Sequence, residues 1–434
     1  MRSRYLLTIA ALATIGSQAV VAAPFEDELR ALIADNPRVK SNQAQVQAAN
    51  RGVRATLSPY FPSIDITGSA GYEYDSTPAF RAAGGPFDYD QRNYTATLRE
   101  TIWDGGKREA NRRASKIQRD VSTLSLVNTR QTVLYEGAST YLNVLRQSEL
   151  VELAQQNGEN IRKQLNLEDE RVRRGSGIAV DSLQAKSRLQ ISLERLVTSQ
   201  GALQDSMSRY LQVHGHPADP KAMAAPMPID KLLPATLEEA IALAVQDNPN
   251  VAAFARRVDL GVEAKRVINA EYYPTIDAIL QDKLEKDFEG AAGLRRDHQA
   301  KVTATWNLFN GFGTTARSQQ QAYDNEARRN DFQDTRRKVE ETTRLAWQAY
   351  QTAMARVTLL DNAVNIASEV FDARRKLRES GKETVINVLD AENEVYSARI
   401  NYTSALYDSR IAAYQLLQAV GRLELENLAA AGAK

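Results

Sequence analysis

The stretch SPYFPSID at residues 58–65 returns in similar form as AEYYPTID at residues 270–277. Each copy contains two aromatic residues and a proline, and then begins an alternation of apolar and polar residues. Proline ends or kinks a helix, and alternation with a period of two is typical of a β-strand. The sequence therefore predicts that the chain passes from a helix into a strand twice, at equivalent places of one plan.

The similarity extends well beyond this turn. DNPRV at residues 35–39 returns as DNPNV at residues 247–251, with the same offset of 212 residues that separates the two turns. Further on, RRGSGIAVDSLQA aligns with RESGKETVINVLDA at an offset of 206, which pairs Gly175 with Gly381. Such self-similarity predicts two tandem structural copies. We expect a first repeat over 24–216, a proline-rich linker over 217–236, a second repeat over 237–423 and a tail over 424–434.

The N-terminus has the layout of a secretory signal peptide over residues 1–23. Arg2 and Arg4 precede a short apolar run, and small residues follow, so cleavage is expected after Ala22 or Ala23. The apolar run is too short to span a bilayer, and no later segment offers eighteen apolar residues in succession. A membrane role would therefore have to come from strands.

Proline positions predict very long helices. The chain has no proline over residues 87–216, nor from residue 275 to its end. We expect β-hairpins at about 63–103 and 275–309, with strands of about ten residues, a length that crosses a membrane at a tilt. The helix after Gly106 would run roughly 100 Å if continuous. The return helix of each copy carries a seven-residue pattern, with small residues such as Ala391, Ala398 and Ala405 on one seam, which favours supercoiled packing.

Aromatic residues gather near the predicted strand ends, as they do in the interfacial girdles of membrane barrels. These residues are Tyr60, Phe61, Trp103, Tyr272, Tyr273, Trp306 and Phe309. Two hairpins that cover a soluble core would explain the same strands. The helices favour the membrane interpretation, because no compact domain accommodates them.

Composition excludes several classes of function. The 434 residues contain 55 Lys and Arg, 54 Asp and Glu and no Cys, for a formal net charge of +1. A net charge this close to zero gives no electrostatic indication of nucleic-acid binding. The absence of Cys excludes disulfides, thiolate chemistry and a lipid anchor on Cys. His214 and His216 form an HGH motif, but two ligands without a supporting carboxylate cluster favour a helix-terminus role. We expect no catalytic residue, no metal and no cofactor.

Four strands cannot close a barrel, since the smallest single-chain bacterial barrels have about eight. Three subunits would pool twelve strands, leave room for an opening and spare each subunit an exposed sheet edge. The repeat, the hairpins and the helix lengths together suggest a homotrimeric tube with a β-barrel at one end and a cylinder of helices beyond it.

The chain resembles the TolC family of Gram-negative outer-membrane efflux and type I secretion channels. The resemblance covers the mature chain and is carried by the DNP segments, the aromatic-proline turns, WDGGKREANRRA, RRGSGIAVDSLQA and SGKETVINVLDAENEVY. It implies a mainly α-helical homotrimer, with a 12-stranded β-barrel in outer-membrane lipid continuous with a long periplasmic α-helical barrel. It also implies passive export, with energy from an inner-membrane ABC or other pump docked through a periplasmic adaptor.

The resemblance further implies functional residues near the two helical turns. The turns would be periplasmic tips that touch the adaptor, at Gly175, Ser176, Gly177, Gly381 and Lys382. Residues near them would close the pore. Asp390 matches a pore-constricting aspartate and Asp181 a gate-linking one. Asn387, Arg378 and Glu383 stand where the family has another aspartate, a tyrosine and an arginine, so the gate is expected to be closed but rewired.

Two alternatives remain at this point. The chain could be a periplasmic coiled-coil adaptor that bridges a pump and a duct, although adaptors usually carry one helical hairpin and not two. Within the duct class, the cargo could be a secreted protein or small toxic compounds, because the pump and not the duct would select it.

Overall fold

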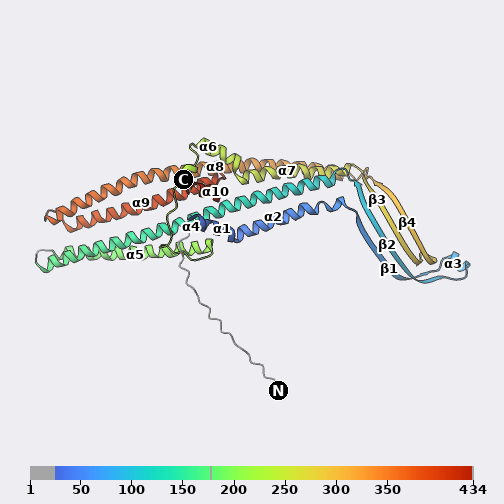
Figure 1. The fold of residues 1–434 in the computed structure, drawn as a ribbon, viewed down its shortest axis with the longest axis horizontal. Helices are drawn as coiled ribbons and strands as arrows, with labels where there is room; N and C mark the ends of the chain where they lie inside the picture. The colour runs from blue at the N-terminus through green and yellow to red at the C-terminus, as the bar shows by residue number, and fades with distance from the viewer. Residues whose placement is uncertain (1–24, 176–177, 433–434) are drawn as a thin grey trace, which may run out of the picture.

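The computed structural model describes residues 25–175 and 178–432. Figure 1 shows an elongated molecule in which long helices run side by side and a small sheet extends from one end. The two long helical hairpins end together at the opposite end. The mainly helical fold with a small antiparallel sheet confirms that part of the predicted architecture.

The first half of the chain begins with short helices, enters a hairpin and then forms the first long helical hairpin. Its elements are α1 (Phe25–Asp35), α2 (Pro37–Ala55), η1 (Ser58–Tyr60), β1 (Ser63–Asp75), α3 (Pro78–Ala82), β2 (Phe87–Trp103), α4 (Lys107–Arg173) and α5 (Ala179–His214).

The second half repeats this order. Its elements are η2 (Asp230–Leu232), α6 (Leu237–Asp247), α7 (Pro249–Asn269), η3 (Ala270–Tyr272), β3 (Thr275–Phe288), β4 (Ala291–Thr305), α8 (Gly313–Glu379), α9 (Val385–Ala419) and α10 (Leu425–Gly432). The long helices α4 and α8 each contain 67 residues, or roughly 100 Å of helix.

The repeated DNP motif starts equivalent helices. Asn36 precedes α2 and Asn248 precedes α7, and each side chain accepts a hydrogen bond of 2.9 Å from a backbone N–H in the first turn. The following proline occupies the first helical position, where its missing N–H costs nothing. The same local chemistry therefore fixes both helix starts.

The strands differ in length from the prediction. They contain 13, 17, 14 and 15 residues rather than about ten. The last strand ends at Thr305, four residues before the predicted end, so Trp306 and Phe309 follow the strand. The indole Nε1 of Trp306 instead donates a hydrogen bond of 3.1 Å to the carbonyl oxygen of Tyr272. The short helix α3 in the first hairpin loop was not predicted.

The four strands form one antiparallel sheet in the order β1-β2-β3-β4. The central pair joins the two repeats, with Arg92 opposite Lys286 at one end and Trp103 opposite Ile276 at the other. Among the described residues, β1 and β4 each pair with one neighbour only. Both outer edges of the sheet are therefore free within one chain.

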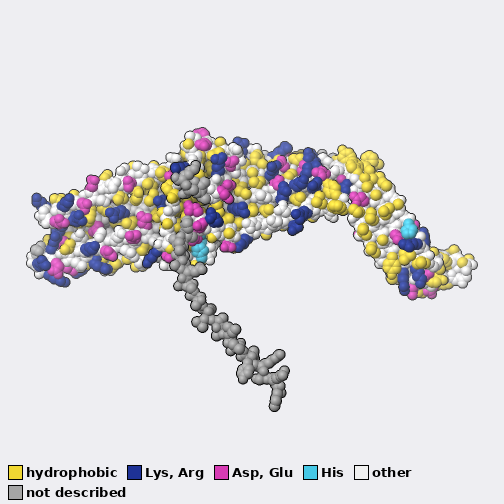
Figure 2. All heavy atoms as spheres, in the orientation of Figure 1, with side chains coloured by type: hydrophobic (Ala, Val, Ile, Leu, Met, Phe, Trp, Pro, Cys, Tyr) yellow, Lys and Arg dark blue, Asp and Glu magenta, His cyan; other side chains and the backbone are white. Residues whose placement is uncertain are grey.

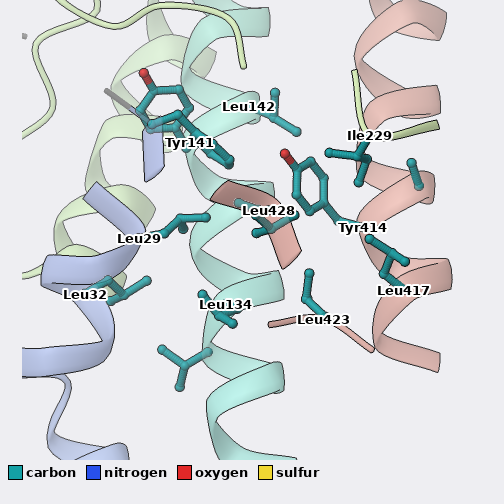
Figure 3. Packing of buried hydrophobic residues seen from close by; sticks show 14 of the residues in the cluster. Leu29, Leu32, Leu134, Tyr141, Leu142, Ile229, Tyr414, Leu417, Leu423 and Leu428 are labelled. Atoms are coloured by element: carbon teal, nitrogen blue, oxygen red, sulfur yellow. The ribbon is translucent and has the colours of Figure 1, made fainter. Parts of the chain in front are cut away.

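The largest apolar core lies midway along the helices, where the linker, α1 and α10 meet α4 and α9. Figure 3 shows Tyr141 of α4 and Tyr414 of α9 among leucines from α1, α9 and α10. The ring of Phe25 contacts Tyr141 at 4.9 Å between centroids. The hydroxyl of Tyr141 donates to the carbonyl oxygen of Ala224 at 3.0 Å. The irregular linker is thereby attached to the helices.

The predicted small-residue seam of α9 is buried. Ala391, Ala398, Ala405, Ala412 and Ala419 all have less than one tenth of their surface exposed. Small side chains let neighbouring helix backbones approach closely. The seven-residue pattern therefore marked the packed side of this helix.

None of the helices in the described parts of the chain has both the length and the apolar character needed to cross a bilayer.

Candidate functional site at the helical tip

The two helical hairpins turn at the end of the molecule farthest from the sheet (Figure 1). Gly175 and Gly381 adopt φ values of +76° and +75°, a left-handed conformation that favours glycine. After Gly381, the N–H of Lys382 donates to the carbonyl of Leu377 at 3.0 Å, which caps α8. Lys382 is exposed. Ser176 and Gly177 lie outside the described residues.

A small apolar cluster packs the two hairpins together just behind the turns. Ile161 and Leu165 of α4 and Ala185 of α5 lie against Val385 and Leu389 of α9. All five side chains are at least nine tenths buried. This cluster is short, so polar contacts nearer the turns must contribute to holding the tips side by side.

Arg378 is the centre of those polar contacts. Its guanidinium lies 2.8 Å from Glu168 of α4 and 3.3 Å from Asp181 of α5, and it donates to the carbonyl of Glu383 at 3.0 Å. Glu168 is 1% exposed and also pairs with Arg171 at 2.7 Å. One arginine from the second hairpin therefore bridges two carboxylates of the first. We refer to Arg378, Glu168 and Asp181 as the tip latch.

Glu383 and Asn387 form a second contact within the α8–α9 turn. The amide of Asn387 donates to the carboxylate of Glu383 at 2.5 Å. This bond, together with one from the backbone N–H of Thr384, lowers the pKa of Glu383. Arg374 donates to the carbonyl of Asn387 at 3.4 Å. These contacts fix the start of α9 relative to the end of α8.

Asp390 does not belong to the tip latch. Its carboxylate accepts a hydrogen bond of 2.6 Å from Arg188 of α5, and its side chain is 52% exposed. The residues expected from the sequence thus separate into three contacts: Arg378 with Asp181, Glu383 with Asn387, and Asp390 with Arg188. The sequence reasoning missed Glu168, Arg171 and Arg188, since nothing in their local sequence distinguishes them from other charged helix residues.

A buried carboxylate lies one half-turn beyond Asp390. Glu392 of α9 is 5% exposed, and neither of its oxygens has a hydrogen-bond partner among the described residues. It lines a cavity of about 200 Å³ between α4, α8 and α9, together with Asn157, Asp372 and Arg399. Burial raises the pKa of Glu392 to about 7, and the nearby Asn160 amide offsets part of this rise.

The predicted girdle aromatics all lie where the sheet meets the helices. Most are well exposed, from 40% for Trp103 to 71% for Phe309, and Tyr60 is half-buried. Trp103 and Tyr273 contact each other across the two repeats at 5.9 Å between ring centroids. Figure 2 shows hydrophobic side chains gathered over this junction and the adjoining part of the sheet, whereas charged side chains are spread over the helices and gather again toward the far end of the sheet.

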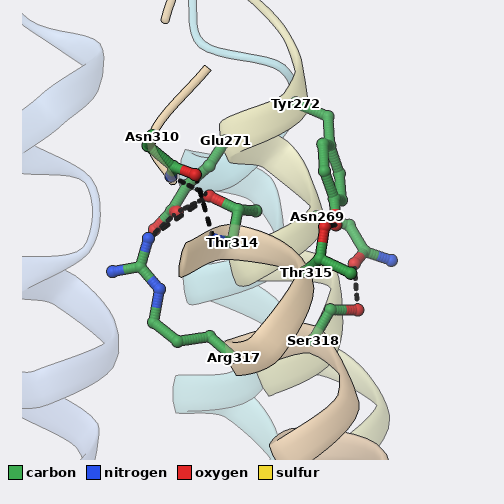
Figure 4. A network of polar contacts seen from close by, with 8 residues as sticks. All are labelled: Asn269, Glu271, Tyr272, Asn310, Thr314, Thr315, Arg317 and Ser318. Carbon is green, nitrogen blue, oxygen red and sulfur yellow. Dashed lines mark hydrogen bonds and ion pairs between the residues drawn. The ribbon is translucent and has the colours of Figure 1, made fainter. Parts of the chain in front are cut away.

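A polar network fixes the junction in the second repeat (Figure 4). Glu271 of η3 accepts a hydrogen bond of 3.0 Å from the hydroxyl of Thr314 and pairs with Arg317, both on α8. The hydroxyl of Ser318 donates to Asn269 at 3.0 Å. In the first repeat, the hydroxyl of Tyr60 donates to Glu109 at 3.0 Å. The sheet is therefore anchored on the helices at two equivalent places.

The sheet itself presents large apolar side chains to the outside. Ile64, Ile66, Leu294 and Val302 are each more than two thirds exposed. Threonines such as Thr67, one residue along the same strand, point to the opposite face, because successive side chains alternate. A sheet with one exposed apolar face and two free edges is incomplete as a water-soluble surface.

Comparison with known proteins agrees with this arrangement. The family described as "Outer membrane efflux protein" matches residues 29–215 and 240–422. The chain belongs to the outer membrane efflux protein family. The matched residues cover both repeats and leave the linker between them unmatched.

Two relatives and one solved structure illustrate the similarity. The outer membrane efflux protein BepC of Brucella suis biovar 1 (strain 1330) is 23% identical, over 91% of this chain and 84% of its own length. The outer membrane protein TolC of Escherichia coli (strain K12) is also 23% identical, over 91% of this chain and 81% of its own length. The crystal structure of VceC from Vibrio cholerae superposes with a TM-score of 0.76 over 92% of this chain and 96% of that chain, at 15% identity, which supports the fold alone.

Membership of the outer membrane efflux protein family confirms three predictions. The chain resembles TolC as expected, it is an outer-membrane protein of the Gram-negative type, and it is a channel and not an enzyme. The alternative of a periplasmic adaptor has no support.

Proposed function

We propose that three copies of this chain form an outer-membrane channel-tunnel, in which twelve strands close a β-barrel and the helices form a periplasmic tube. The observation that carries the proposal is the pair of free sheet edges on β1 and β4, 13 and 15 residues long. An unpaired strand in lipid leaves its backbone polar groups unsatisfied at several kcal/mol each. Pairing β4 of one subunit with β1 of the next removes both edges in a closed ring.

The side chains of the sheet support the same arrangement. The exposed Ile64, Ile66 and Val302 suit lipid contact, and the alternate threonines suit a water-filled interior. The aromatic residues at the junction would then lie in the interfacial layer, where their rings are stable. These are Tyr60, Phe61, Trp103, Tyr272, Tyr273, Trp306 and Phe309.

Helices of roughly 100 Å would extend from the outer membrane far into the periplasm. The tips would meet a periplasmic adaptor, with the exposed turns at Gly175, Gly381 and Lys382 as contact surfaces, and the adaptor would connect the tube to an inner-membrane pump. Transport through the tube would be passive, with the energy supplied by the pump. The pump selects the cargo, whether a secreted protein or small toxic compounds.

We further propose that the tip latch keeps the periplasmic end closed. Arg378 connects the tip of α8 to Glu168 and Asp181 of the first hairpin, so outward movement of either hairpin would break two ion pairs. Asp390 would lie near the axis of the trimer, where three copies favour cations. Arg188 reduces this field, since it pairs with Asp390 at 2.6 Å. Asn387 and Glu383 would hold the shape of the constriction.

The experiment that tests the proposal uses the full chain expressed in a Gram-negative host. We expect it in the outer-membrane fraction, as an oligomer that migrates as three chains in SDS gels without heating and as one chain after boiling. We also expect it to conduct ions in planar lipid bilayers. A water-soluble periplasmic monomer without conductance would refute the channel. Cross-links between engineered cysteines on β1 and β4 of different subunits would test the strand pairing, and the wild-type chain contains no cysteine to interfere.

A further inference from the structure

In the structure, the HGH motif at residues 214–216 lies beside a carboxylate that is distant in sequence. Helix α5 ends at His214, and Gly215 reverses the chain with a φ of +83°, so that His216 returns beside His214. Glu28, in the first turns of α1, lies 3.2 Å from the Nε2 atom of His216. One ligand atom from each of Glu28, His214 and His216 lies within 4.8 Å of the other two.

The hydrogen bonds of His214 define its tautomer. Its Nε2 atom lies 3.3 Å from the carbonyl oxygen of Gly137. A carbonyl can only accept, so Nε2 carries the hydrogen and Nδ1 keeps its lone pair. That Nδ1 atom is buried and has no hydrogen-bond partner among the described residues. Metal-binding histidines typically have this arrangement, in which the second ring nitrogen donates to a backbone carbonyl.

The surroundings hold the ring of His214 in place. Tyr210, one turn earlier in α5, stacks on it with 3.9 Å between ring centroids and an angle of 8° between planes. The Tyr210 hydroxyl donates to the Glu28 carboxylate at 3.2 Å, which positions that ligand too. On the other side lies Gly137 of α4, where an added Cβ atom would lie 3.7 Å from Cε1 of His214 and would displace the end of the Leu32 side chain.

We propose that Glu28, His214 and His216 form a binding site for a divalent transition metal ion, with Zn²⁺ as the ion that this ligand set fits best. Two imidazoles and one carboxylate are an established zinc ligand set, and they leave a fourth tetrahedral position for water. The absence of thiolates and the presence of imidazole disfavour Mg²⁺ and Ca²⁺. The metal would satisfy the unpartnered Nδ1 atom.

The site would act as a clamp in the middle of the molecule. It joins α1, the first described helix of the chain, to the end of α5, where the linker begins. His216 is 49% exposed, so the ion can reach the site from solvent. The proposal does not depend on transport, because a metal clamp would stabilise this region whether or not the tip latch controls the channel.

The test measures zinc binding to the purified full-length oligomer in detergent, carrying an affinity tag without histidine and freed of metal with a chelator. We expect one Zn²⁺ per chain by isothermal titration calorimetry at pH 7.5, and a higher thermal midpoint with Zn²⁺ than with Mg²⁺. His216→Ala and Glu28→Gln should each weaken zinc binding by at least about tenfold, since even outer-shell changes at zinc sites cost 10–100-fold. Both positions are more exposed than His214, so these variants should fold.

The third histidine of the chain provides the matched control. His298 lies in β4, 3.1 Å from Asp282 of β3, and His298→Ala should leave zinc binding unchanged. A stoichiometry well below one ion per chain would overturn the proposal. So would equal zinc affinities in the wild type, His216→Ala and Glu28→Gln, which would leave the cluster as an ordinary ion pair at a helix end.

Discussion

Replacing Arg378 with alanine is expected to open the periplasmic end of the channel. Arg378 lies 2.8 Å from Glu168, whose side chain is 1% exposed, and 3.3 Å from Asp181. Loss of one member of a buried ion pair typically costs about 3–5 kcal/mol, because the remaining charge stays buried without its partner. Arg171 stays beside Glu168 at 2.7 Å. We therefore expect a smaller cost, about 2 kcal/mol, at the closed tip of each subunit.

A cost of this size has a measurable effect on channel opening. If the charges separate and become hydrated when the tip opens, the cost applies to the closed state only. About 2 kcal/mol then shifts the ratio of open to closed tips by roughly 30-fold. In planar bilayers, Arg378→Ala should therefore show larger single-channel conductance, or spend far more time in high-conductance states, than the wild type.

The same helix offers a matched control. Arg375 is one turn away and pairs with Asp372 at 3.1 Å, but both side chains are about half exposed. Exposed ion pairs contribute about 0–1 kcal/mol, so Arg375→Ala should conduct like the wild type. The double variant Arg378→Met with Glu168→Gln should increase the conductance by less than the sum of the increases in the two single variants. Equal conductance in Arg378→Ala, Arg375→Ala and the wild type would refute a role for Arg378 in holding the tip closed.

Two further predictions concern carboxylates near the tip. Asp390→Ala should weaken block of the current by divalent or trivalent cations, and Arg188→Ala should strengthen this block by exposing Asp390. Unchanged block in both variants would place Asp390 away from the ion path. Burial raises the pKa of Glu392 to about 7, above the ordinary value of about 4.3. The stability due to its protonated form is therefore complete below about pH 4 and lost as pH rises to about 7, by up to ~3 kcal/mol. Glu392→Gln should raise the thermal midpoint at pH 8 but not at pH 4, and an equal shift at both would contradict this.

The transitions between helix and strand could be predicted because their causes are local. The helices α2 and α7 end a few residues before the prolines at 62 and 274, each is followed by a short 3₁₀ turn, and the strand begins at the residue after the proline. The left-handed turns at Gly175 and Gly381 could be predicted for the same reason, because their cause lies in the glycine itself. The end of β4 was less predictable. The apolar alternation continues through Trp306, but its indole bonds to the backbone of Tyr272, and the ladder stops at Thr305.

Contacts between distant segments could not be predicted in the same way. The partner of Arg378 is Glu168, 210 residues away, and their meeting depends on how two helical hairpins lie against each other. Likewise, the sequence around HGH contains no nearby acidic ligand, and Glu28 reaches His216 only because α1 packs beside the end of α5. The family resemblance indicated Arg378 and Asp181 as candidate gate residues, but it did not indicate Glu168 or Glu28.

The two copies of the plan differ at the residues that form the tip latch. At the repeat offset of 206 residues, Glu168 is equivalent to Arg374, and Asp181 is equivalent to Asn387. Arg378 is equivalent to Val172, so the opposite charges of the tip latch are not part of the shared plan. Divergence of the two copies instead placed acidic residues on the first hairpin and arginines on the second. The two hairpins are therefore no longer interchangeable. In the proposed ring of three subunits, such a difference would allow one class of hairpin to move against the other, so that the end of the tube would open with threefold symmetry while the sheet stays closed.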